Sequence, residues 1–264
     1  MSTAAISLPT DRPSIVRIFL TEVRYEFVRA LRTKAYSMSV IGFPLVFYLF
    51  FGLLMNRNEN FHGMSVATNM LAGYAVFGAI GASLFGIGVG LAGDLSAGWL
   101  ELKRASPMPP LAYLLAKCCT AMGFATIIVT ALTIMGVVFG GVHISVGEYI
   151  RMVALVVVGS IPFAAMGLLL ALVAPFNAAP GIANMIYLPM SFLGGLWMPI
   201  EVLPKFLQRL APIFPTYHLK QLMLGVFQYS GAGRTSTHWL ALFAFTVVML
   251  FCAGYAFRRR EQNS

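Results

Sequence analysis

Long stretches without a charged side chain are the feature that most limits how this chain can fold. Five of them contain no Asp, Glu, Lys or Arg, and they cover residues 35–56, 60–93, 118–147, 152–200 and 235–257. The hydrocarbon layer of a membrane is about 30 Å thick and a helix rises about 1.5 Å per residue, so a spanning helix needs about 20 apolar residues. Each stretch is therefore long enough to cross a membrane once, and the fourth is long enough to cross twice.

The fourth stretch is divided near its middle by the sequence Pro-Phe-Asn-Ala-Ala-Pro at residues 175–180, which is typical of a turn. The sequence therefore predicts an all-α polytopic membrane protein, with residues 1–264 as a single transmembrane domain of six spanning helices. We place these helices at about residues 36–55, 70–93, 112–139, 151–173, 180–198 and 239–257. The apolar runs are continuous rather than alternating, which favours helices over the strands of a β-barrel.

Composition excludes the main soluble alternatives. Charged residues make up 10% of the 264 residues and apolar residues 59%, whereas about a quarter of the residues in soluble domains are charged. A soluble domain of this size could not bury so much apolar surface. A soluble enzyme, a disordered chain and a secreted disulfide scaffold are therefore excluded.

The basic residues indicate how the chain is inserted in the membrane. With six spans both termini lie on one side, and that side holds twelve of the 18 lysines and arginines, in residues 12–34, 103–117 and 258–260. Because lysine and arginine are enriched in the cytoplasmic flanks of spanning helices, we expect both termini in the cytoplasm. The same rule accounts for the net charge of +9, so we expect no nucleic-acid partner.

The N-terminal segment 14–34 has the pattern of an amphipathic helix. Apolar residues recur at helical spacing from Val16 to Leu31, and arginines occupy the other side. Such a helix lies in the plane of the membrane surface, in contact with lipids. It serves either as a simple topology anchor or as a docking surface for a cytoplasmic protein. The charged residues that we single out for docking are Glu22, Arg24, Glu26 and Arg29.

Residues 94–107 form the main predicted cytoplasmic loop. Asp94 or Ser96 can cap a short helix in it, and Pro107 would end that helix. The mixed charge of the loop is compatible with a binding segment and equally with an ordinary cytoplasmic loop. The candidate binding residues are Asp94, Gly98, Trp99, Glu101, Lys103, Arg104 and Pro107.

The segment 199–238 is predicted to lie on the outer side of the membrane. It contains two short amphipathic pieces, at about 201–210 and 216–228, which are too short to cross. They could enter the outer leaflet as a re-entrant pair, because helical hydrogen bonds satisfy their backbones. We expect their charged side chains to reach the interface by snorkelling. These are Glu201, Lys205, Arg209 and Lys220.

Motifs for chemistry are sparse in this sequence. Gly88, Gly90 and Gly93 match a dinucleotide-binding pattern, but they end a predicted span, where close helix packing is the better interpretation. The four histidines are scattered and are predicted to be ordinary interfacial residues. No GxxxxGK[ST] phosphate-binding loop occurs in the sequence, so we expect no ATP site on this chain. Because no predicted span has an ionisable residue at its centre, we assign no catalytic and no metal-binding residue.

A first informative sequence pattern lies in the predicted cytoplasmic loop and just after it. Residues 98–101 read Gly-Trp-Leu-Glu, and Ser-Pro at 106–107 and Lys117 follow. This order resembles the Gly-Thr-x-Glu … Thr-Pro … Lys pattern of the membrane subunits of ABC transporters of the ABC-2, or exporter, type.

A second and more specific pattern lies in the outer segment. It reads Gly-Leu-Trp-Met-Pro at 195–199, Leu-Pro at 203–204 and Pro-Thr-Tyr at 215–217. It resembles the family's Gly-x-x-x-Pro … Leu-Pro … Asn-Pro-x-Tyr run. The order of amphipathic helix, six spans, one main cytoplasmic loop and re-entrant segment is also similar to that of the family.

The resemblance implies a role for each segment. Residues 94–107 would form a coupling helix that sits in a cleft of a separate P-loop ATPase subunit, with Glu101 as its central contact. The N-terminal helix would flank the same ATPase. A second permease chain, identical or closely related, would complete the pathway. The outer segment would close the external side, and its gate residues would be Trp197, Pro199, Pro204, Pro215 and Tyr217.

The resemblance further implies an ATP-driven exporter of the bacterial plasma (inner) membrane. ATP and magnesium would be bound by the partner ATPase, so this chain would need no cofactor. The charge-free interior favours an amphipathic, drug-like or lipid-like cargo, since nothing in the spans would offset the cost of desolvating an ion. The aromatic candidates for lining the pathway are Phe43, Phe47, Phe85 and Tyr187. The alternatives are a membrane-embedded lipid-modifying enzyme and a carrier that works alone.

Overall fold

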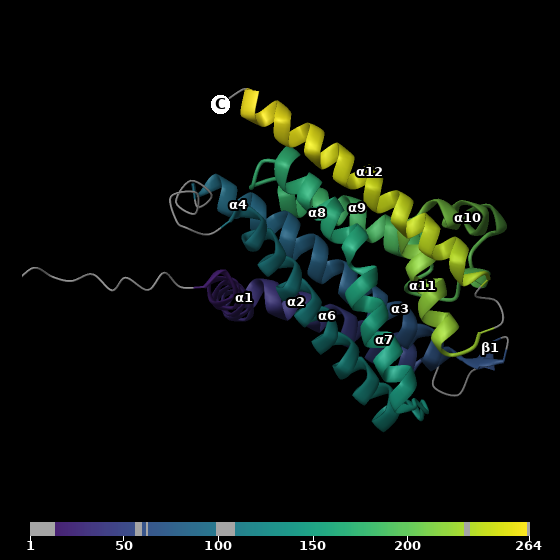
Figure 1. Ribbon diagram of the computed structural model, residues 1–264. Helices are drawn as coiled ribbons and strands as arrows, with labels where there is room; N and C mark the ends of the chain where they lie inside the picture. Colours follow the sequence, from purple (N-terminus) through teal and green to yellow (C-terminus); the bar gives the residue numbers. More distant parts are fainter. Residues whose placement is uncertain (1–13, 56–59, 62, 99–108, 230–232, 263–264) are drawn as a thin grey trace, which may run out of the picture.

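In the computed structural model the chain is a bundle of long helices (Figure 1). The structure describes residues 14–55, 60–61, 63–98, 109–229 and 233–262. Five candidate residues of the predicted cytoplasmic loop lie outside these ranges: Trp99, Glu101, Lys103, Arg104 and Pro107.

The helices follow the predicted order along the chain. The first half contains α1 (Ile15–Arg32), α2 (Lys34–Phe47), α3 (Val66–Ser83), α4 (Gly90–Ser96) and α6 (Pro110–Gly140). The second half contains α7 (Val146–Gly159), α8 (Ile161–Val173), α9 (Ala179–Leu193), α10 (Lys205–Leu210), α11 (Pro215–Val226) and α12 (Thr235–Gln262). Short 3-10 turns at Ile200–Val202 and Ala211–Ile213 flank α10. Two two-residue strands, β1 (Asn60–Phe61) and β2 (Met64–Ser65), pair antiparallel between α2 and α3.

Five helical segments of the described chain are long and apolar enough to cross a membrane. They are Lys34–Leu54, Val66–Ser96, Leu111–Gly140, Val146–Val173 and Thr235–Arg260. They correspond to five of the six predicted spans, and the prediction of an all-α polytopic membrane protein is confirmed.

The remaining predicted span, 180–198, is not among these five segments. It corresponds to α9, whose 15 residues reach about 22 Å and fall short of a hydrocarbon layer of about 30 Å. The helix ends at Leu193 because the chain turns through Gly194 and Gly195 instead of continuing. A sixth crossing therefore stays a prediction.

Two of the spanning segments contain a π-helical stretch. One, Tyr48–Leu54, continues α2, and the other, Leu84–Val89, joins α3 to α4. Such stretches change the direction in which side chains point and are frequent at functional sites. Phe85 belongs to the second stretch and lines a cavity described below.

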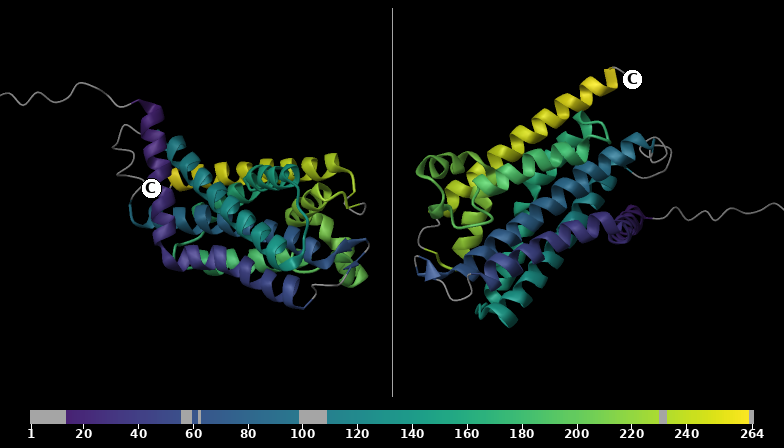
Figure 2. Two further views of the ribbon diagram at one scale, coloured as in Figure 1. Left: turned by 90° about the horizontal axis from the view of Figure 1, so that it is seen from below. Right: turned by 180° about the vertical axis from the view of Figure 1, so that it is seen from behind.

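The segment from α3 to α4 is the centre of the bundle, and α12 lies on its outside (Figures 1 and 2). Small residues let neighbouring backbones approach the central segment. A Cβ atom on Gly73 would lie 2.1 Å from the carbonyl oxygen of Leu196, so only glycine fits there. A Cβ atom on Gly88 would lie 3.3 Å from the backbone of Gly167 in α8, which confirms the interpretation of Gly88 as a packing residue.

The N-terminal helix α1 lies across the end of the bundle rather than along it (Figure 2, left). The hydroxyl of Ser14 caps its first turn by accepting from the backbone N–H of Arg17. The ends of α4 and α12 lie at the same end of the bundle, whereas α10, α11 and β1 lie at the opposite end (Figure 1). We call these the α1 end and the α11 end.

The predicted outer segment contains two short helices, α10 and α11. The second of them packs inside the protein, against α3, α7, α9 and α12, and nearly all its side chains are buried. The prediction that Lys220 snorkels to the interface is therefore wrong, because this lysine points into the protein and is 2% exposed. Lys205 and Arg209 on α10 are exposed.

Candidate functional site

A cluster of charged side chains joins three helices at the α1 end. Glu26 and Arg29 come from α1, Asp94 from α4, and Tyr113 and Lys117 from α6. Glu26, Asp94 and Lys117 are buried, with 5%, 2% and 5% of their surfaces exposed. The side chain of Arg29 is 41% exposed and covers the cluster from outside. We call these five residues the charge cluster.

Each ionised group of the charge cluster contacts two groups of opposite charge. Lys117 Nζ lies 2.9 Å from Glu26 Oε2 and 2.8 Å from Asp94 Oδ2. Arg29 Nη2 lies 2.6 Å from Asp94 Oδ1, and Arg29 Nη1 lies 3.5 Å from Glu26 Oε1. The hydroxyl of Tyr113 donates a further hydrogen bond to Asp94 Oδ2. Three of these four ion pairs join different helices, and the Arg29–Glu26 pair lies within α1.

The charge cluster is electrically neutral, with two carboxylates and two basic groups. This balance matters because an isolated charge in a low-dielectric interior costs several kcal/mol or more, whereas a paired and hydrogen-bonded one is tolerated. The hydrogen bond to Asp94 raises the pKa of Arg29 above its usual value, with Glu26 adding to the effect. The ion pairs therefore compensate the charges that burial brings together.

The charge cluster contains some of the predicted site residues and omits others. Glu26, Arg29 and Asp94 are brought together from segments predicted to act separately. Arg24 is exposed on α1 and Glu22 is half-buried there, outside the cluster. Gly98 follows α4 with a positive φ of 70°, a conformation that suits glycine.

Sequence reasoning misplaced Asp94 and missed Tyr113. Asp94 was expected in a cytoplasmic loop, but the central helix continues through Ser96 and carries Asp94 into the bundle. Tyr113 and Lys117 are four residues apart, so they share one face of α6. A single lysine beside a tyrosine at the start of an apolar helix is the signal that could have indicated a buried partner for Asp94.

A second feature is a cavity of about 580 Å³ on the side of the bundle. Its walls come from α2, α3, α9, the π-helical stretch before α4 and the turn after α9. The four aromatic residues predicted to line the pathway, Phe43, Phe47, Phe85 and Tyr187, all line this cavity. We call it the aromatic cavity.

The wall of the aromatic cavity contains a stacked pair of aromatic rings and two polar side chains. The rings of Phe77 and Tyr187 stack with centroids 4.6 Å apart, and the Tyr187 hydroxyl donates to the backbone oxygen of Phe77 at 2.7 Å. Ser39 and Asn184 also line the cavity and add hydrogen-bonding groups to a largely apolar surface. An apolar body with a small polar group is the kind of ligand that such a surface accommodates.

The five predicted gate residues do not form one cluster in the structure. Trp197 lines the aromatic cavity, with its ring 6.1 Å from that of Phe47. Tyr217 lies at the α11 end, with its ring 5.5 Å from that of His218. The three prolines also differ in their surroundings. Pro199 is buried, Pro204 is exposed, and Pro215 is buried at the start of α11.

Lys220 is a buried cation at the α11 end. Its ammonium donates hydrogen bonds to the backbone oxygens of Gly195 and Met198, the second at 3.1 Å. Burial lowers the pKa of Lys220 to about 7. These hydrogen bonds hold the turn after α9 against helix α11.

Two histidines meet beside this lysine's helix. Nδ1 of His218 on α11 lies 2.8 Å from Nδ1 of His238 on α12, and Nε2 of His218 lies 2.9 Å from the carbonyl oxygen of Pro212. Since a carbonyl only accepts, Nε2 of His218 carries a proton, and a neutral His218 then accepts from His238 at Nδ1. The prediction of scattered interfacial histidines is wrong for this pair, which lies 20 residues apart in the sequence.

The fold and the charge cluster define a class of protein, a multi-pass helical membrane protein with a cluster of paired charges at one end. Comparison with known proteins then identifies the family. A family model for the ABC-2 type transporter matches residues 18–228 of this chain. The chain therefore belongs to the ABC-2 type transporter family, which confirms the resemblance seen in its sequence.

A relative with a known sequence supports the same assignment. The chain is 27% identical over 237 residues to a protein of Bacillus subtilis (strain 168) named "Putative transport permease YvfS". The match covers 89% of this chain and 95% of the relative. Together the family and the relative indicate a transport permease subunit rather than an enzyme.

Proposed function

We propose that this chain is the permease subunit of an ATP-driven ABC exporter in the bacterial plasma membrane. Two permease chains and separate ATPase subunits make up the working complex, with ATP and magnesium bound by the ATPases. The termini and the α1 end face the cytoplasm, in line with the excess of basic residues there. Family membership supports the ATPase partner.

The observation that carries this proposal is the position of the charge cluster. Helix α4 ends at Ser96 and helix α6 begins at Pro110. Asp94 and Lys117 stand close to these two points and are joined by an ion pair. A load that an ATPase applies to the segment between them therefore reaches α4 and α6 together.

The charge cluster also extends this load to the aromatic cavity. Glu26 and Arg29 tie α1 to α4 and α6, and only Thr33 separates α1 from α2. The helix α2 supplies Phe43 and Phe47 to the cavity wall. Movement of the segment between α4 and α6 is thus passed through ion pairs to α1, then to α2, and so to the cavity.

We propose that the aromatic cavity is one half of the transport pathway and that a second chain closes it. Phe43 on α2 and Met185 on α9 are exposed beside it, so this side presents both a cavity and an apolar surface. The apolar lining favours an amphipathic, drug-like or lipid-like cargo over a small ion. Ser39 and Asn184 supply the contacts for a polar group of that cargo.

The coupling role is tested in proteoliposomes that contain the permease and its P-loop ATPase, which is first identified by co-purification. ATP hydrolysis and the export of a panel of amphipathic dyes are measured on the same vesicles. Arg29→Gln is expected to lower the amount of dye exported per ATP hydrolysed severalfold, because it removes one link between α1 and α4. Arg17→Gln changes an exposed arginine of the same helix that is outside the predicted docking set, so it serves as the matched control and is expected to behave as the wild type.

An unchanged export ratio in Arg29→Gln, or equal losses in both variants, would show that the charge cluster does not couple the two activities. Dye flux or lipid turnover by the permease alone, without the ATPase, would instead support a stand-alone carrier or a lipid-modifying enzyme.

The paired arrangement is tested by cross-linking in a background with Cys118, Cys119 and Cys252 replaced. Met185→Cys, beside the aromatic cavity, is expected to form a cross-linked dimer with a short bifunctional reagent. Phe251→Cys on the outer helix α12 is the control, since its side chain is also exposed. Cross-linking at position 251 and not at 185 would contradict the proposal, because the two permease chains would then meet at α12 rather than at the aromatic cavity.

A further inference from the structure

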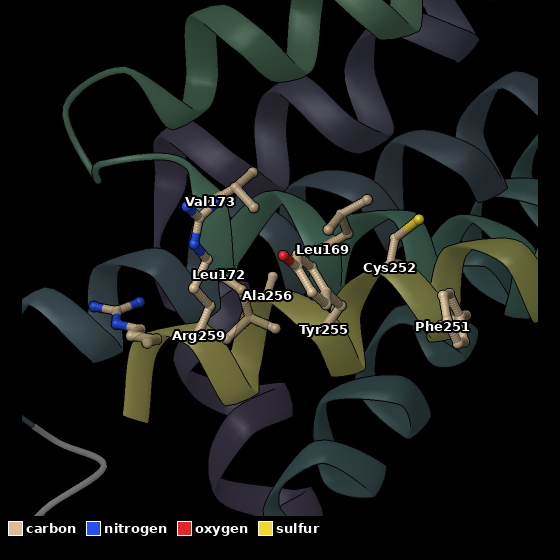
Figure 3. Close-up of a pocket in the computed structure, with 9 residues that line it drawn as sticks. Leu169, Leu172, Val173, Phe251, Cys252, Tyr255, Ala256 and Arg259 are labelled. Carbon is tan, nitrogen blue, oxygen red and sulfur yellow. The ribbon is translucent and has the colours of Figure 1, made fainter. Parts of the chain in front are cut away.

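A second groove lies far from the aromatic cavity in the fold, between α8 and the end of α12 (Figure 3). Its volume is about 570 Å³, within the range of roughly 300–1,000 Å³ typical of ligand sites. Leu169, Leu172 and Val173 line it from α8. From α12 it is lined by Phe251, Cys252, Tyr255, Ala256, Arg259 and Arg260.

The groove is apolar along most of its length and basic at one end. The basic end holds two of the three consecutive arginines that close α12, Arg259 and Arg260, whereas Arg258 does not line the groove. Arg259 is exposed and has no ion-pair partner among the residues that the structure describes. Tyr255, whose hydroxyl is visible in Figure 3, lies one helical turn before Arg259.

We propose that this groove binds a membrane phospholipid whose headgroup carries a net negative charge. The phosphate lies at Arg259 and Arg260, and an acyl chain lies along the apolar part of the groove against Leu169 and Leu172. Guanidinium groups bind phosphate oxygens in bidentate pairs, and basic pockets between spanning helices suit acidic lipids. The Tyr255 hydroxyl adds a donor at the level where tyrosine meets lipid headgroups.

Charge selects an acidic lipid over a zwitterionic one at this site. A headgroup such as ethanolamine would bring its own ammonium towards two arginines, which would repel it. Phosphatidylglycerol carries no such cation. Ordinary snorkelling of terminal arginines into the interface needs no groove beneath them, so the combination of arginines and groove is the feature that indicates a bound lipid.

The proposal is independent of the transport direction and of the ATPase partner, because it needs only that the chain spans a membrane. It is tested on the purified full-length protein after delipidation, by native mass spectrometry. Dioleoyl-phosphatidylglycerol and dioleoyl-phosphatidylethanolamine are added back separately, and the fraction of protein that carries one lipid is measured against lipid concentration. We expect the first lipid to bind at least tenfold more tightly than the second.

Two variants test separately how the arginine charges and the apolar part of the groove contribute to lipid binding. Removing both arginines in Arg259→Gln/Arg260→Gln is expected to weaken phosphatidylglycerol binding by about 30-fold, which corresponds to about 1 kcal/mol for each arginine. Leu172→Trp fills the apolar part without changing charge and is expected to reduce binding at the same site. Arg258→Gln is the control, since it removes one positive charge of the same triplet outside the groove, and we expect less than a twofold change.

The proposal is overturned if phosphatidylethanolamine binds as tightly as phosphatidylglycerol. A loss of about fivefold in Arg258→Gln, half that of the double variant on a logarithmic scale, would show a general attraction to positive charge rather than a site. Unchanged binding in Leu172→Trp would show that no acyl chain lies in the groove. Size-exclusion profiles of all variants check that each remains folded, and Leu172→Ile, which keeps the groove open, should bind as the wild type does.

Discussion

The two ends of the bundle stabilise buried charged side chains in different ways. At the α1 end, buried Glu26, Asp94 and Lys117 neutralise one another, with Arg29 completing the set. At the α11 end, the buried ammonium of Lys220 is held by backbone carbonyl oxygens of Gly195 and Met198. One end relies on ion pairs among side chains of three helices. The other relies mainly on hydrogen bonds from one lysine to backbone carbonyl groups, with Glu201 adding an electrostatic attraction.

This difference suggests a division of roles between the ends. Ion pairs between helices resist separation strongly, because parting them leaves bare charges in a low-dielectric interior. They therefore suit the end where an ATPase would push. Hydrogen bonds from one lysine to carbonyl groups are broken at lower cost, which suits the end where the proposed exporter has to open.

The largest expected effect is on the stability of the α1 end. Lys117→Met removes a cation that pairs with both buried carboxylates, and losing one partner of a buried pair typically costs about 3–5 kcal/mol. We expect a loss of this size in the free energy of unfolding, measured by denaturant titration in detergent micelles. The exposed lysine at the start of α2 gives a matched control, and Lys34→Met should change stability by less than about 0.5 kcal/mol.

A smaller effect is expected from the corresponding change at the α11 end. Lys220→Met removes a buried cation and leaves two neutral carbonyl groups unpaired, which costs about 1–3 kcal/mol. The same titration measures it, with exposed Lys205→Met as the control. A loss as large as that of Lys117→Met would remove the proposed difference between the ends.

The smallest expected effect is a pH dependence at the α11 end. Burial lowers the pKa of His218 below its usual value of about 6.5, with His238 adding to the effect against the hydrogen bond to Pro212. The unfolded chain therefore takes up a proton before the folded chain does. The stability that neutral His218 confers is complete above about pH 6.5 and is lost as the pH falls below it.

Thermal unfolding of the purified protein between pH 8 and pH 5.5 measures this dependence. We expect His218→Gln to flatten the acid part of the profile, while His143→Gln, which changes an exposed histidine, leaves it as in the wild type. Parallel profiles for the wild type and His218→Gln would show that His218 does not titrate in this way.

Much of the fold follows from the charge-free stretches, because the thickness of a membrane dictates the length of a span. The same argument places α1 by its apolar stripe and predicts short helices near α10 and α11. The pairing of side chains does not follow from it. Glu26, Asp94 and Lys117 come from three separate segments, and periodicity says nothing about which helices become neighbours. The prediction that Lys220 reaches the interface is wrong for the same reason. An amphipathic segment has the same sequence pattern whether its polar residue faces water or a buried turn.

The aromatic residues of the pathway were easier to predict from sequence. In long apolar helices the aromatic and small residues are almost the only side chains that stand out. Phe43, Phe47, Phe85 and Tyr187 line one cavity although they come from three helical segments. The groove at Arg259 could not be inferred from sequence, since it depends on how the end of α12 meets α8. In the sequence alone, a run of arginines after a span indicates only the direction of insertion.

The most direct test of the central claim is a double-mutant cycle between Glu26→Gln on α1 and Lys117→Gln on α6. The free energy of unfolding is measured in the same micelles for the wild type, both single variants and the double variant. The account predicts that the double variant is more stable than the sum of the single losses implies, with a coupling energy of about 1–3 kcal/mol. Single losses that add to within about 0.5 kcal/mol would contradict it, because α1 and α6 would then not be joined through these charges.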